Sequence, residues 1–165
     1  MGVQAVTMYT SFPAAIFKGA FPLGELNNIW ISMINTDEGT PAADDTRHFY
    51  QITGSGPTYA IGYNPLKLSG ARLFQEGDDL VFAANNVTFR KTTREDDEWG
   101  VHPVGPYSRN PVASHCTIWY ARPGASRPQG LMCFFSVNWG SMFSTGIETI
   151  TWNDNGIFRC KLEGS

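Results

Sequence analysis

Two clusters of acidic residues are the first candidates for chemistry. Asp37, Glu38, Asp44 and Asp45 lie within one turn-rich stretch, and Glu95–Glu98 form a second cluster. Paired carboxylates can act as general acid and base in glycoside hydrolysis, and they can also bind calcium. Neither cluster follows the position-by-position ligand pattern of a calcium loop, so we interpret both as hydrated loop charge.

The histidine, cysteine, serine and glycine residues form no specific catalytic or metal-binding motif. The three histidines show neither HExxH nor His-x-His spacing. The three cysteines fall inside expected strands and form no CxxC pair, which favours buried, reduced thiols. Gly54–Pro57 lacks the helix and lysine of a phosphate-binding loop, and no Gly-x-Ser-x-Gly elbow occurs. We therefore expect no enzymatic activity, no cofactor and no metal.

Composition narrows the class of partner. The net charge is −3, and nucleic-acid-binding proteins usually gather Lys and Arg on one face, so nucleic acid is not an expected partner. The apolar runs end well before the roughly 20 residues of a membrane-spanning helix, so no membrane association is expected. The first residues also lack the basic and then apolar layout of a secretory signal, which indicates a protein made and assembled in a cytoplasm.

The elements that would position any site are mostly strands. In the 165 residues, turn-forming stretches separate short apolar or alternating segments, with no alternation of strands and long helices. The pattern predicts a mainly all-β protein: one antiparallel β-sandwich or jelly-roll-like domain, residues 1–165, of about eight strands. Residues 66–73 alternate as a single half-exposed strand, and residues 1–21 are expected to form a short N-terminal helix or irregular arm.

Two hairpins are predicted from turn chemistry. Residues 147–152 and 157–162 alternate apolar and polar side chains around Asn153–Gly156, where Asn155 and Gly156 tolerate positive φ angles. Residues 79–83 and 87–90 are likewise expected to pair with each other around Asn85 and Asn86. The terminal hairpin is the most specific structural signal in the chain.

Aromatic side chains outside the strands are candidate contacts with a partner. Residues 92–113 combine the second acidic cluster with three prolines, Trp99, His102 and Tyr107, which is typical of a long surface loop. An aromatic ring in such a loop either packs beneath it or contacts a partner. We predict partner-binding roles for these three residues and for Phe12 and Phe17 of the N-terminal arm.

The order of several motifs resembles that of a known family. These motifs are Ile29–Met33, Gly54–Gly56, Asn86–Phe89, Ile118–Ala121 and, most specifically, Thr149–Phe158. They are similar to motifs of small virion structural proteins of tailed bacteriophages, over most of the chain. Residues 92–113 are longer than the usual turn of that family, and Asn153 stands where an aspartate is common.

The resemblance implies a capsid decoration, or cement, protein on the surface of a virion. Its expected partners are the major capsid protein and further copies of itself, as a trimer or dimer. A different hypothesis is a tail or receptor-binding component whose long loop recognises a host surface. A third is a glycan hydrolase that uses the acidic cluster Glu95–Glu98.

Overall fold

A computed structural model of the chain confirms the mainly β class. It describes residues 2–3, 5–19, 21, 26–35, 58–59, 66–90, 113–121, 130–137, 147–153 and 156–161. In this part of the chain a short N-terminal helix, α1 (Ser11–Phe17), accompanies antiparallel sheets. The strands are β1 (Thr7–Met8), β2 (Ile29–Asn35), β3 (Thr58–Tyr59), β4 (Leu66–Lys67), β5 (Arg72–Glu76), β6 (Asp79–Ala83), β7 (Val87–Arg90), β8 (Ala113–Tyr120), β9 (Leu131–Ser136), β10 (Ile147–Ile150) and β11 (Phe158–Lys161).

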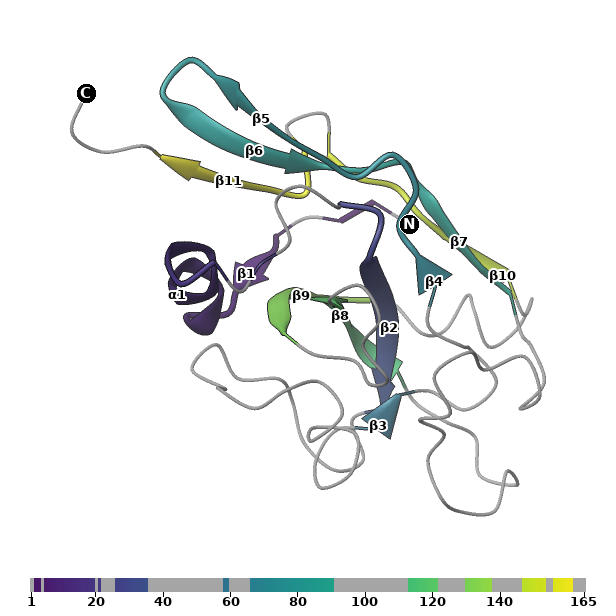
Figure 1. Cartoon of the computed structure of the whole chain (residues 1–165). Coiled ribbons are helices and arrows are strands. Elements are labelled where there is room, and N and C mark those ends of the chain that lie inside the picture. The colour runs from purple at the N-terminus through teal and green to yellow at the C-terminus, as the bar shows by residue number, and fades with distance from the viewer. Residues whose placement is uncertain are drawn as a thin grey trace.

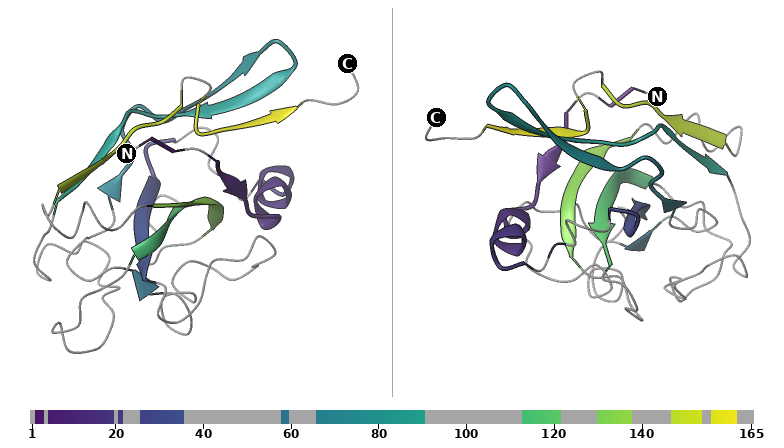
Figure 2. Two further views of the ribbon diagram at one scale, coloured as in Figure 1. Left: turned by 180° about the vertical axis from the view of Figure 1, so that it is seen from behind. Right: turned by 45° about the horizontal axis from the view of Figure 1, so that its top comes forward.

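The strands form two β layers that face each other (Figure 1). One layer has the order β1-β9-β8-β2-β3, with β4 also paired to β2. The other consists of β11-β6-β5 together with β10-β7. From two further directions the second layer again lies across the strands of the first (Figure 2). This is the face-to-face arrangement expected of a β-sandwich. It differs from a jelly roll, which divides eight strands between its two sheets.

Both predicted hairpins are wrong in their pairing. β10 pairs with β7 and β11 pairs with β6, so the segment 147–161 runs antiparallel to the whole segment 79–90. Ile150 faces Val87, and Phe158 faces Phe82. From one pair to the other, the C-terminal segment advances by eight residues while its partner segment advances by five. The two segments therefore form a long ribbon in which one of them has three more residues than the other between these pairs.

The extra residues fall at Asn153–Gly156, the turn that was predicted to join two hairpin arms. The Gly156 amide donates a 2.9 Å hydrogen bond to the Asn153 carbonyl oxygen, and Gly156 has a φ of 89°. Beside the turn, the Trp152 indole Nε1 donates to the Asn85 carbonyl oxygen and the Trp152 amide donates to Asn86 Oδ1. Asn85 and Asn86 thus connect β6 to β7 and hold the opposite segment, rather than reversing the chain.

The predicted strand 66–73 is also divided. β4 pairs with β2 in the first layer, whereas β5 pairs with β6 in the second. The chain changes layer at Gly70, whose φ is 64° and whose Cβ position would meet the Asn85 side chain at 2.7 Å. Side chains alternate on each side of Gly70, but the inward positions change from 66 and 68 to 71 and 73, where the positive φ ends the strand.

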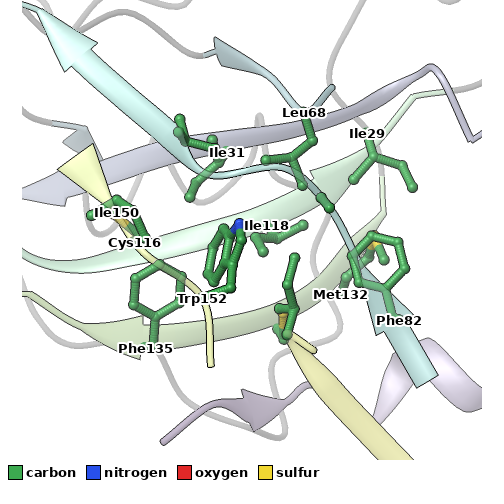
Figure 3. Close-up of a cluster of buried hydrophobic side chains, with 14 of the residues drawn as sticks. Ile29, Ile31, Leu68, Phe82, Cys116, Ile118, Met132, Phe135, Ile150 and Trp152 are labelled. Carbon is green, nitrogen blue, oxygen red and sulfur yellow. The ribbon is translucent and has the colours of Figure 1, made fainter. Parts of the chain in front are cut away.

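The main core lies between the two layers. Alternate residues of β2, β8 and β9 point toward the ribbon, where side chains of β6 and β10 meet them. Figure 3 shows this cluster: Ile29, Ile31, Leu68, Phe82, Cys116, Ile118, Met132, Phe135, Ile150 and Trp152. These side chains are almost entirely removed from solvent, which makes their burial the main source of stability for the sandwich.

A second buried cluster lies on the opposite face of the first layer. Trp30 and Trp119 stack with ring centroids 5.6 Å apart, and Tyr9 and Leu131 belong to the same cluster. The Trp119 indole Nε1 donates a 2.9 Å hydrogen bond to the buried Ser32 hydroxyl oxygen. Both faces of this layer are therefore packed, which explains why β2 is mostly apolar and why β8 ends in the continuous apolar run Ile118–Tyr120.

Candidate binding surface

Helix α1 is short because its sequence allows only about two turns. Pro13 lies in the first turn, where its missing amide hydrogen costs no helical hydrogen bond. The helix ends as the Lys18 amide donates to the Ala14 carbonyl oxygen and Gly19 takes a φ of 68°. A left-handed glycine just past the last turn is a common helix terminator, and it fixes where the helix stops.

The inner face of α1 attaches the helix to the sandwich. Phe12 is 2% exposed and packs edge-on against Phe21 and against Phe158 of β11, with centroids 5.0 and 5.7 Å apart. Ala15 and Ile16 are partly buried against the same core. α1 is thus held on the β framework by apolar contacts, beside β1 and below β11 (Figure 1).

The outer face of α1 is apolar as well. Pro13, Ala14 and Phe17, which share one side of the helix at positions i, i+1 and i+4, are all exposed. Phe17 is 92% exposed, and the only other large exposed hydrophobic side chain among the described residues is Phe74, at 38%. A helix that is hydrophobic on all sides is normally buried, so this face has the composition of a surface that a partner covers.

The described side chains offer little reactive chemistry. Burial raises the pKa of the Cys116 and Cys133 thiols far above the ordinary value, and it raises the pKa of Cys160 as well. Thiols held in the protonated form are poor nucleophiles. Burial also lowers the pKa of His115, whose ring lies near Phe134. In the ranges that the structure describes, no group of three His, Cys, Asp or Glu residues could hold a metal ion.

Charged groups on the outer face of the ribbon pair with each other. Arg159 of β11 donates one hydrogen bond to Asp79 Oδ2 and another to Glu76 Oε2, and each has a donor–acceptor distance of 3.1 Å. The Glu76 side chain is well exposed, so water and salt screen this interaction. The group ties the three strands β5, β6 and β11 together at their outer surface.

Two hollows occur beside these strands. One of about 170 Å³ lies between the N-terminal Val3 and Val6 and the segment Trp152–Arg159. The other, about 660 Å³, is an open depression beside β4, lined by Leu26, Asn27 and residues 67–71. The first is smaller than a typical ligand pocket, and Lys67, the single charged side chain lining the second, already lies over the Trp30 ring. The described residues that line the two hollows do not include a set of converging polar side chains.

The predicted site residues fall into two groups. Trp99, His102 and Tyr107, like the acidic cluster Glu95–Glu98, lie outside the described residues. Of the N-terminal pair, Phe17 is exposed, whereas the ring of Phe12 is part of the core and is not accessible to a partner. The two phenylalanines point to different sides of the helix because they are five positions apart. At 3.6 residues per turn, five residues rotate a side chain about 140° beyond one full turn.

One exposed feature was missed by the sequence interpretation. Strand β5 lies at the edge of its sheet, with Arg72, Phe74 and Glu76 exposed. Their alternation was visible in the sequence, but the predicted strand ended at residue 73. The two-residue turn Gly77–Asp78, with glycine at its first position, was the signal for a β5–β6 hairpin.

Comparisons with protein-family models, with curated proteins and with solved structures gave no match. The described part of the chain contains no helix long and apolar enough to cross a membrane. The site is therefore defined by its own geometry: a mainly β framework that carries an exposed apolar helix face.

Proposed function

We propose that the chain is a capsid decoration protein of a tailed bacteriophage and that it binds the lattice of the major capsid protein. The observation that carries a binding role is the outer face of α1, where Phe17 is almost fully exposed on a helix anchored by Phe12. The proposed location on a virion is based on the resemblance of motifs such as Thr149–Phe158 to small phage structural proteins.

A small apolar contact suits this role. One aromatic side chain contributes about 150–250 Å² to an interface, whereas a stable two-body complex needs about 800 Å² from each partner. A single α1 contact is therefore weak, but it is repeated at every copy bound to a shell. Contacts that exist only in the assembled shell stabilise that shell by mass action, and no catalysis is required.

Cryo-microscopy of particles produced from the genome that carries this gene tests the proposal. The expected result is density for a small β-sandwich on the shell, with α1 facing the capsid subunits. Density confined to the tail would support the receptor-binding alternative and overturn the proposal, and so would particles that lack the chain.

The role of α1 is tested with a matched pair of variants. Phe17→Ser removes the exposed ring, and we expect it to weaken the affinity for the particle at least about tenfold, which corresponds to the loss of one good apolar contact. Lys18→Ala changes the next exposed residue and should bind as the wild type does. Equal binding of both variants would contradict a role for the helix face.

A further inference from the structure

We infer that β5 is a self-association edge, through which two copies of this chain pair antiparallel about a twofold axis at Phe74. Among the described strands, β5 pairs only with β6, and it lies at the outer margin of the ribbon (Figure 1). An exposed edge strand presents a row of backbone groups that another strand can pair with. The question is which strand fits this edge.

The backbone directions along β5 follow from its turn. A two-residue turn is closed by an i to i+3 bond, so the polar backbone groups of Glu76 face Asp79. These groups alternate between the two sides of an antiparallel strand, so those of Phe74 and Arg72 also face β6. Leu73 and Gln75 therefore direct their amide and carbonyl groups toward the free edge.

A second copy satisfies these groups in one symmetric arrangement. With the axis at Phe74, Leu73 lies opposite Gln75 of the second copy, and each such pair can exchange both of its backbone hydrogen bonds. The Phe74 side chains then meet across a non-hydrogen-bonded position, where side chains come closest. The arrangement extends the β11-β6-β5 sheet into one continuous sheet across both copies.

The charges of β5 are complementary to themselves in this register. Arg72, Phe74 and Glu76 share the outer face of the strand, since side chains alternate along it and Leu73 packs on the core. The twofold axis places Arg72 of each copy opposite Glu76 of the other, on both sides of the two phenylalanines. A strand that reads Arg-x-Phe-x-Glu is thus complementary to itself, and the Glu76 carboxylate would accept from Arg72 of the second copy as well as from Arg159 of its own chain.

Other registers are disfavoured by the same side chains. Moving the axis to position 72 places the two Arg72 side chains opposite each other, and moving it to position 76 does the same for Glu76. Like charges directly opposite each other destabilise a strand pair. Among the registers centred on Arg72, Phe74 and Glu76, the charged residues therefore favour the one centred on Phe74, whereas charges on an edge strand usually serve only to prevent pairing.

Five residues of edge make a small interface, so the dimer is expected to be weak in isolation. Sedimentation equilibrium should be measured from about 1 µM to 1 mM, the concentration range that a weak interface requires. The wild-type mass should rise from that of the 18.2 kDa monomer toward twice that value. A mass that stays monomeric up to the highest concentration would overturn the inference.

Charge reversal gives the sharper test. R72E places acidic side chains opposite each other and E76R places basic ones opposite each other, so each variant alone should remain monomeric. An equimolar mixture of R72E and E76R places opposite charges across the axis in a mixed dimer, which should therefore form. Lys18→Glu makes the same charge change as R72E on helix α1 and should dimerise as the wild type does.

Each outcome of the mixing experiment decides the matter. Recovery of the dimer in the mixture supports the register, because damage to folding in either variant would not be repaired by mixing. A mixture that stays monomeric, or a single variant that dimerises like the wild type, would exclude this pairing. The measurements need no particle, so failure of the dimer leaves the capsid proposal standing, and absence from the shell leaves the dimer standing.

Discussion

Gly156 lies directly against Val81 of β6: a Cβ atom at position 156 would be 2.7 Å from Val81 Cγ1 and 2.9 Å from the Phe82 carbonyl oxygen. Val81 points to the outer face of the ribbon, yet it is almost completely buried. Gly156 lies over this residue and helps to cover it from solvent. The close approach requires a glycine.

Replacing Gly156 by alanine should destabilise the protein more than the same change at Gly77. Both residues have positive φ, 89° and 61°, which costs an alanine about 1–2 kcal/mol. Only at Gly156 does the added methyl group overlap its neighbours, and overpacking costs about 1–3 kcal/mol more. Urea unfolding of Gly156→Ala and Gly77→Ala measures the difference; equal losses would show that the turn can move away from Val81.

The same turn shows what could be predicted from the sequence and what could not. Alternation around Asn153–Gly156 correctly indicated strands on both sides and a positive φ at Gly156. The pairing partners were wrong because alternation specifies which face of a strand is apolar and does not specify its neighbour. Val87 of the distant β7 pairs with Ile150, and turn residues that could reverse a chain can also loop out of a continuing strand.

The helix illustrates a second limit. Apolar residues near helical spacing predicted α1, but they could not show which of its phenylalanines faces the core. That choice depends on Phe158, which lies far away in sequence and packs against Phe12. The edge position of β5 is equally a property of the assembled sheet, because a strand becomes an edge only when its neighbours are known.

Truncating the two phenylalanines of α1 should change stability by very different amounts. Phe12→Ala removes a core ring and should lower the free energy of unfolding by about 3–5 kcal/mol. Phe17→Ala removes an exposed ring and should change it by less than about 0.5 kcal/mol. Chemical denaturation of both variants provides the comparison, and a large loss for Phe17→Ala would mean that this ring is buried in solution.

His115 should make the fold sensitive to mild acid. Burial lowers the pKa of its imidazole in the folded state, so below the ordinary value near 6.5 the unfolded chain binds a proton that the folded protein resists. The contribution of His115 to the free energy of unfolding is therefore fully present above that pH, and it is lost as the pH falls toward the folded-state pKa. His115→Gln removes this component, so the difference in melting temperature between pH 7.5 and pH 5 should be smaller than in the wild type. An unchanged difference would mean that His115 titrates alike in both states.

Disulfide trapping distinguishes the observed ribbon from a terminal hairpin. Thr88 and Thr149 lie opposite each other with their hydroxyl oxygens 2.9 Å apart, so cysteines at these positions would direct their sulfur atoms toward each other. In a hairpin closed at Asn153–Gly156, position 149 would instead lie opposite the native Cys160, which in the structure faces Leu80. Oxidation of dilute T88C/T149C should link positions 88 and 149, whereas T149C alone should form no link to Cys160. Peptide mapping by mass spectrometry identifies the bonds.

A disulfide between position 149 and Cys160 in T149C would show that the two arms pair with each other and that β7 and β6 have different neighbours.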